Sequence, residues 1–326
     1  MNSATRPKGA AWGARLTFAA LLLVASELIV WQAPLQYDLM DWLGLIAVYL
    51  ALAAIALDLV ARLRAADAPS LLLVAGVYGL ANGTLIGHVA TRDLPVSLIV
   101  RPLGAQPLAF LAALGALWLL LSGRGGPRPP RLLAAAIGGL AWGVWVRWAP
   151  GASDGAIPLV SAVTALVAAA LGLAACLLIA FLAPRAPVER RDDWLLGPVE
   201  WIASGAVLLA ALIWGVARGD IGASVVVTLI AYMLGALIAT RGLRADRCAL
   251  DAVTPPRAPH VAGWVAASAL FLIAGGVGYA LPGSGDRSAQ GDLLIGLLTA
   301  FGILWLPVVS ALVGMRAFVQ LAREQG

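Results

Sequence analysis

LLVAGVYGLANGTLIGHV, residues 72–89, is the stretch on which the fold of this chain depends. Gly79, Gly83 and Gly87 recur every four residues and Gly76 precedes them by three, so on a helix they form one ridge without side chains. In water each glycine would cost such a helix about 1 kcal/mol relative to alanine. A bilayer leaves the backbone no alternative to helical hydrogen bonding. The stretch therefore predicts a membrane helix whose glycine ridge packs against a neighbouring helix.

Polar side chains flank this ridge. On a helix Tyr78 and Asn82 lie on one side of it, and Thr84 and His88 lie on the other. Polar contacts between membrane helices contribute only ~0.6 kcal/mol on average and are common for structural reasons. The first interpretation is therefore that these residues hold helices together. The second is that Tyr78, Asn82 and His88 line a binding cavity.

The composition places the whole chain in a membrane. Of 326 residues, 61% are hydrophobic and 12% are charged, whereas soluble proteins average about 25% charged residues. The net charge of +5 does not indicate nucleic-acid binding, because the basic residues lie in short loops between apolar runs. Two cysteines lie at different expected depths, Cys176 in an apolar run and Cys248 in a charged loop, so we expect no disulfide.

Apolar runs long enough to cross about 30 Å of hydrocarbon predict about ten helices. They cover residues 12–31, 42–61, 69–90, 104–122, 132–150, 157–183, 195–217, 221–241, 259–282 and 292–318. The connections are short, so we expect one integral membrane domain over residues 1–326, with short tails at 1–11 and 319–326. Pro307 predicts a kink or a break in the last run.

The basic residues predict the orientation. Alternate connections hold most of them, and the opposite side holds only Arg92, Arg101, Arg147, Arg218 and Arg287. Since cytoplasmic loops are enriched in Lys and Arg, we expect both termini in the cytoplasm of a bacterial cell, with the chain in its cytoplasmic (inner) membrane.

Few ionisable residues fall inside the runs, where each costs about 2.5 to 3.5 kcal/mol at the helix centre. Glu27, His88 and Arg147 have a similar expected depth near the outer interface. One hypothesis is a polar substrate-binding cluster of these three, with Arg92, Asp93 and Arg101 at its mouth. The alternative is that Arg147 reaches the surface and Glu27 pairs with a neighbour. Near the other interface, Asp58 and Arg62 predict a helix-end ion pair, and Glu200 predicts a helix-start carboxylate.

Motifs for familiar enzyme chemistry are absent. The chain has two histidines, His88 and His260, and contains no HExxH, GxxxxGK[ST] or GxSxG. We therefore expect no metal site and no cofactor, and the sequence favours a non-enzymatic role.

Residues 26–86 resemble an uncharacterised family of multi-pass bacterial membrane proteins. The likeness lies in SELIVWQAPL, then DLVARLR, then SLLLVAGVYGL. Members carry a Glu in the first helix and a Gly-rich third helix, often with an acidic residue after its Tyr-Gly pair, where this chain has Ala81-Asn82-Gly83. The resemblance implies no activity. By expected helix count and termini, the chain is also similar to ten-helix drug/metabolite transporters.

The expectation is a polytopic helix bundle that acts as a permease for a small or amphipathic molecule. Its substrate contacts would be Glu27, Tyr78, Asn82, His88 and Arg147. Two alternatives stay open: a lipid-modifying membrane enzyme, and a non-catalytic subunit of a membrane complex. Expected partners are membrane lipids, other membrane subunits or a second copy of the chain, and no nucleic acid.

Overall fold

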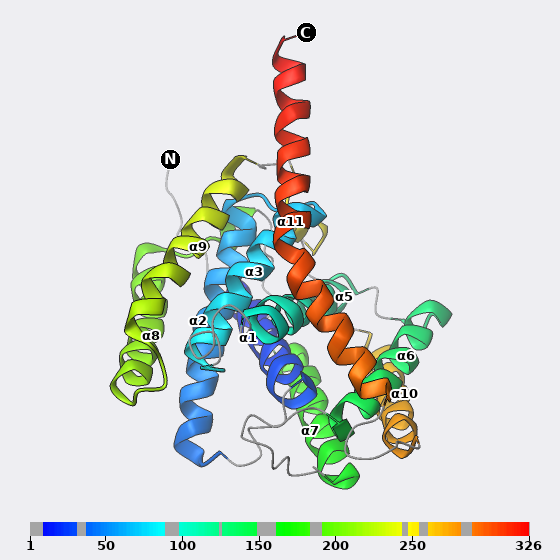
Figure 1. Cartoon of the computed structure of the whole chain (residues 1–326). Helices are drawn as coiled ribbons and strands as arrows, with labels where there is room; N and C mark the ends of the chain where they lie inside the picture. Colours follow the sequence, from blue (N-terminus) through cyan, green and yellow to red (C-terminus); the bar gives the residue numbers. More distant parts are fainter. Residues whose placement is uncertain are drawn as a thin grey trace.

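The computed structural model describes residues 9–30, 37–88, 98–123, 126–148, 161–182, 191–242, 247–253, 260–281 and 289–325, and this part of the chain is entirely helical outside its turns (Figure 1). Its longer helices are α1 (Gly9–Leu23), α2 (Leu39–Arg62), α3 (Ala68–Leu85), α5 (Gln106–Leu121), α6 (Pro129–Trp148), α7 (Ala162–Leu182), α8 (Pro198–Ala217), α9 (Ala223–Gly242), α10 (Val261–Ala280) and α11 (Ala289–Gln325). Two π-helical segments, η1 (Val24–Val30) and η3 (Ile99–Ala105), continue α1 and precede α5. Two short 3₁₀ segments are η4 (Arg191–Trp194) and η5 (Ala249–Val253).

Seven of the described helices are long and apolar enough to cross a membrane. They are Ala11–Val30, Leu39–Arg62, Ala68–Leu85, Arg101–Leu121, Ala162–Leu182, Pro198–Ala217 and Val261–Ala280. Among the residues that the structure describes, α9 and α11 contribute the shorter apolar stretches Leu229–Ile238 and Leu293–Trp305. The prediction of an all-helical chain is therefore confirmed for the described residues, and the seven apolar helices are compatible with a multi-pass membrane protein.

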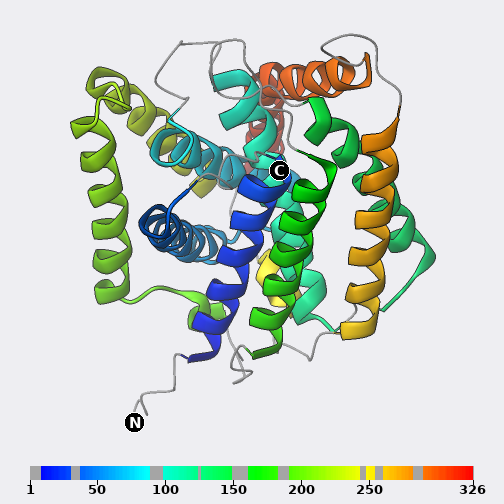
Figure 2. The same cartoon turned by 90° about the horizontal axis from the view of Figure 1, so that it is seen from below.

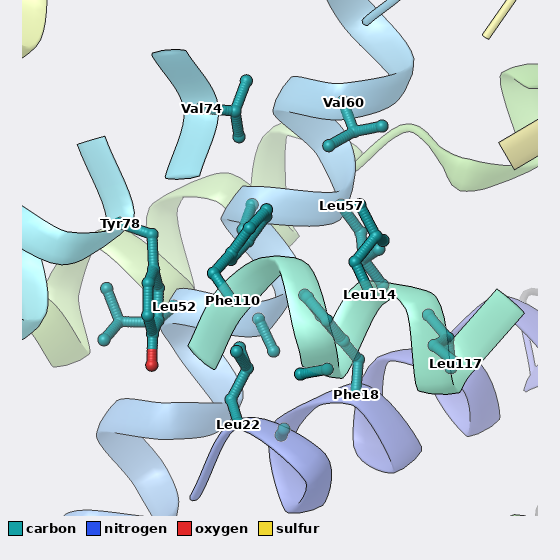
Figure 3. Packing of buried hydrophobic residues seen from close by; sticks show 14 of the residues in the cluster. Phe18, Leu22, Leu52, Leu57, Val60, Val74, Tyr78, Phe110, Leu114 and Leu117 are labelled. Atoms are coloured by element: carbon teal, nitrogen blue, oxygen red, sulfur yellow. The ribbon is translucent and has the colours of Figure 1, made fainter. Parts of the chain in front are cut away.

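The centre of the bundle is formed by α1, α2, α3 and α5. Phe18 of α1 meets Phe110 of α5 edge-on, with ring centroids 5.5 Å apart, and Tyr78 of α3 lies 5.2 Å from the same Phe110 ring. Leu57 and Leu117 close this core from α2 and α5 (Figure 3). Such contacts between facing helices are what fixes helices together where the solvent is itself hydrocarbon.

The outer helices show the opposite pattern. In the α1 span 67% of the residues are buried inside the protein, whereas in α8 the figure is 11%. Figures 1 and 2 show α8 at one flank of the molecule and α10 at the other. Val199, Ile202 and Ile213 of α8 are exposed, and so much apolar surface is stable only against lipid or another apolar partner.

Helices α6 and α10 form the most extensive pair in the described structure. A Cβ atom at Gly143 would collide with the carbonyl oxygen of Gly275, and one at Gly139 with that of Phe271. The sequence Gly139-Leu-Ala-Trp-Gly143 is a GxxxG pattern, which lets two helix backbones approach closely.

Helices α3 and α11 differ from the sequence predictions. Helix α3 ends at Leu85, because the backbone N–H groups of Ile86 and Gly87 both turn back to the carbonyl oxygen of Asn82. His88 follows with a left-handed φ of 50° and so is not helical. Helix α11 continues through Pro307 without a break and extends to Gln325, so part of the expected tail 319–326 is helical.

Candidate functional site

A buried network of polar side chains lies between α1, α2, α3 and α5, and Glu27 is its central residue. Glu27 stands in η1 and is 1% exposed. Its Oε1 accepts a hydrogen bond from the Tyr49 hydroxyl of α2 at 2.6 Å, and the Ser26 hydroxyl lies 3.3 Å from the same oxygen. A carboxylate this deep in an apolar bundle is stable only when it is hydrogen-bonded or paired.

The network continues from Tyr49 into α3. Asn82 donates from Nδ2 to the Tyr49 hydroxyl at 2.8 Å and lies 3.4 Å from the Tyr78 hydroxyl. Tyr78 and Asn82 are one helical turn apart, which is why both reach the same point. The structure therefore brings three of the predicted site residues, Glu27, Tyr78 and Asn82, into one place.

On the other side the network reaches η3 and the start of α5. The Ser26 hydroxyl donates to Gln106 Oε1 at 2.7 Å, and Arg101 Nη2 lies 4.0 Å from Glu27 Oε2. Arg101 is 13% exposed. Pro102 follows Arg101 and has no N–H to donate, which favours an irregular turn here. The two members of the ion pair thus stand on the two π-helical segments, a form of backbone that is frequent at functional sites.

Gly79 of α3 lies against the segment that carries Arg101, and so does Gly87, which follows the end of α3 and is therefore not part of the helical ridge that the sequence predicts. A Cβ atom at Gly79 would collide with the carbonyl oxygen of Pro102, and one at Gly87 would lie 3.1 Å from Cζ of Arg101. These glycines therefore let η3, the segment that carries Arg101, pack close to α3. Farther along the same face Gly76 lies against the indole ring of Trp305 from α11, and Gly83 is buried.

Two amide groups in the network are only partly satisfied. Asn82 Oδ1 and Gln106 Nε2 are buried and have no hydrogen-bond partner among the described residues. Exchanging the oxygen and nitrogen of either amide would still leave one polar atom of that side chain without a partner. An unmade hydrogen bond of this kind costs about 1–3 kcal/mol, so each amide has free capacity for a ligand or a water molecule.

An apolar groove of about 430 Å³ adjoins the network. Its lining includes Ala25 and Ala105, the chain neighbours of Ser26 and Gln106. The far wall comes from α6, α10 and α11 and contains aromatic rings: Trp142, Trp145 and Phe271. Trp142 stacks on Phe271 with ring centroids 5.3 Å apart. The site therefore combines a polar centre with an apolar compartment of ligand size.

The other predicted site residues lie elsewhere. Arg147 Nη1 donates to the carbonyl oxygens of Tyr279 and Leu281 at the end of α10, at 2.8 and 2.7 Å. A Cβ atom at Gly215 of α8 would lie 3.6 Å from His88 Nε2, so His88 lies beside α8. The cation that faces Glu27 is Arg101 rather than Arg147. Arg92 and Asp93 lie outside the described residues.

Three residues of the network are not among the predicted contacts: Ser26, Tyr49 and Gln106. Tyr49 and Gln106 are single polar residues in apolar runs, and this is the signal that could have pointed to them.

A second ionic cluster joins the ends of α1, α2 and α8. The Arg15 guanidinium lies 3.6 Å from Glu200, and Glu200 also accepts hydrogen bonds from Trp12 Nε1 and the Gly197 N–H. Asp58 accepts two hydrogen bonds from Arg62, at 2.9 and 3.1 Å. The predicted helix-end ion pair and helix-start carboxylate are both confirmed. Arg15 also donates to the carbonyl oxygen of Trp194, and Asp58 accepts from the Leu196 N–H, so the cluster fixes the segment around η4 to the bundle.

Among the described residues no group of three or more His, Cys, Asp or Glu side chains could hold a metal ion. Cys176 and Cys248 form no disulfide, and the Cys248 thiol donates to the carbonyl oxygen of Val60 at 3.4 Å.

Comparisons with protein-family models, with curated proteins and with solved structures find no match for this chain.

Proposed function

We propose that this chain is a permease-like transporter of an amphipathic molecule in the bacterial cytoplasmic membrane. One observation carries the proposal: a Glu27–Arg101 ion pair is enclosed in the centre of the bundle, on two π-helical segments, beside an apolar groove. An ion pair in hydrocarbon is costly to bury. A transporter has a use for it, because substrate can replace the internal contacts when the bundle opens.

In this proposal the apolar part of the substrate occupies the groove lined by Trp142, Trp145 and Phe271. When the bundle opens, the polar end of the substrate contacts the amide atoms of Gln106 and Asn82 that have no partner among the described residues. Substrate binding weakens the Glu27–Arg101 contact, which lets η1 and η3 move apart. The smooth glycine face of α3 lets η3 slide without losing van der Waals contact.

The proposal includes ten membrane spans, with α6, α9 and α11 added to the seven apolar helices, and both termini in the cytoplasm. The distribution of basic residues between alternate connections supports this orientation. Helix α6 has 20 residues, which is the length needed to span the hydrocarbon at about 1.5 Å per residue.

An assembly role for the glycine ridge is less well supported. Gly76 and Gly79 already contact Trp305 and Pro102 of the same chain. This face of α3 is therefore covered within the chain and is not open to a partner protein.

The proposal is tested by thermal unfolding of the purified chain in lipid nanodiscs with a panel of amphipathic metabolites and lipids. We expect at least one ligand to raise the midpoint in the wild type, and the shift to disappear in Glu27→Gln and in Asn82→Ala. Arg218→Gln is the control for loss of a charge, because Arg218 is 60% exposed and pairs with Asp220. If no ligand shifts the midpoint and both site variants are merely less stable, the network only holds helices together.

A further inference from the structure

A second cavity lies on the opposite side of α3 from the polar network. It has a volume of about 570 Å³ and lies between α3, η3, α9 and α11. This is within the usual range for small-molecule sites, about 300–1,000 Å³. Its lining is mainly apolar and contains no charged side chain, and its polar groups are Tyr232, Trp305 and Ser310.

Trp305 gives this cavity a hydrogen-bonding requirement. The side chain is 7% exposed, and its Nε1 is buried without an acceptor among the described residues. An indole N–H can only donate, so the missing partner is an acceptor. Trp305 lines the cavity, and the Cζ2–Cε2 edge of its ring lies directly against Gly76.

The depth of the cavity restricts the class of ligand. Gly76 and Tyr232 lie at the middle of α3 and α9, and Trp305 lies at the middle of the apolar run 292–318. With α9 and α11 as spans, all three are near the centre of the bilayer. Charged groups are excluded from that depth by their cost. The ester groups of glycerolipids lie at the interface, outside the hydrocarbon core.

The cavity is also continuous with the lipid-facing surface. Tyr232 is 55% exposed, and its neighbours Leu234 and Ile238 are 54% and 68% exposed. A hydrophobic molecule can therefore enter sideways from the bilayer without crossing an aqueous phase.

We propose that this cavity binds a neutral hydrophobic molecule with a ring carbonyl, of the isoprenoid quinone class. Trp305 Nε1 donates to one carbonyl oxygen, and the hydrocarbon tail extends along the surface of α9. The site is distinct from the Glu27–Arg101 network and does not depend on the proposed transport.

The test is equilibrium binding of decylubiquinone to the full chain in nanodiscs. Trp305→Phe keeps the aromatic ring and removes the donor, so binding should weaken about fivefold to tenfold, the equivalent of one net hydrogen bond. Gly235→Leu should abolish binding, because Gly235 lines the cavity and a Cβ atom there meets nothing within 4 Å. The added side chain therefore starts in open space at the wall of the cavity, where it competes with a ligand.

Matched controls are Gly44→Leu and Trp142→Phe, which should leave the dissociation constant unchanged. Gly44 also has open space around it, and Trp142 Nε1 is likewise buried without a partner but lines the other groove. The proposal is overturned if decylubiquinone does not bind, or if Gly235→Leu leaves binding intact. It is also overturned if decylbenzene, which has no carbonyl, binds the wild type as tightly as decylubiquinone does and Trp305→Phe weakens the binding of neither compound.

Discussion

The hydrogen bond between Tyr49 and Glu27 provides a quantitative prediction about the polar network. The donor–acceptor distance is 2.6 Å, and the two side chains are 0% and 1% exposed. Hydrogen bonds to charged groups contribute about 1.5–3 kcal/mol, whereas ordinary polar contacts between membrane helices contribute ~0.6 kcal/mol. Arg101 faces the same carboxylate at 4.0 Å and favours its charged form. We therefore expect a coupling energy in the higher of these two ranges, about 2 kcal/mol.

The measurement is a double-mutant cycle of Tyr49→Phe and Glu27→Gln, with unfolding free energies from SDS titration in mixed micelles. The cycle removes the separate loss of the Asn82 contact with Tyr49, because that loss occurs whether or not Glu27 is present. Glu27→Gln combined with Arg62→Ala is the control cycle and should be additive within about 0.5 kcal/mol. A Tyr49–Glu27 coupling of ~0.6 kcal/mol or less would refute the charged network and favour simple helix packing.

Three further predictions concern other parts of the molecule. Asp58→Ala should destabilise the protein by about 1–3 kcal/mol because it leaves the buried Leu196 N–H without its acceptor, while Arg62→Ala, at a 45% exposed position, should cost less than Asp58→Ala in the same SDS titration. Gly79→Ala should cost about 1–3 kcal/mol because its methyl group meets a backbone carbonyl, whereas Gly44→Ala should stabilise by up to about 1 kcal/mol; equal effects would contradict the close approach at α3. Reporter fusions should place both termini in the cytoplasm, and a terminus on the outer face would contradict the ten-span topology.

The helical membrane fold could be predicted from the sequence because it follows from hydropathy and length. The positions of the helices agree closely with the apolar runs, since a bilayer leaves the backbone few other options. Glu27 and Asn82 could be identified as candidates because polar residues in such runs are conspicuous.

The partners of Glu27 could not be predicted from the sequence. Position in a run gives the depth of a residue, but it does not say which helices are neighbours. Glu27 and Arg147 have similar expected depths, yet Arg147 caps the end of α10. Arg101 was expected in a loop at the mouth of the site. Instead, the π-helical segment η3 extends the helix back to Ile99, and Arg101 lies inside the bundle.

The close contact between α6 and α10 also has a signal in the sequence. The GxxxG pattern from Gly139 to Gly143 predicts a close helix contact as directly as the ridge in α3 does. In a chain with 36 glycines, however, the pattern alone does not identify the partner helix.

The central claim is that the chain transports its substrate past the polar network, which requires the network to become accessible from each side of the membrane in turn. This accessibility is tested most directly at Gln106. A Gln106→Cys variant is made in a background in which the buried native thiols Cys176 and Cys248 are replaced by Ala. It is treated with a membrane-impermeant maleimide in right-side-out and in inverted vesicles, with exposed Asp41→Cys as the control for one-sided labelling. The account predicts labelling of Gln106→Cys from both sides. Labelling from neither side, with the Asp41→Cys control labelled normally, would contradict it.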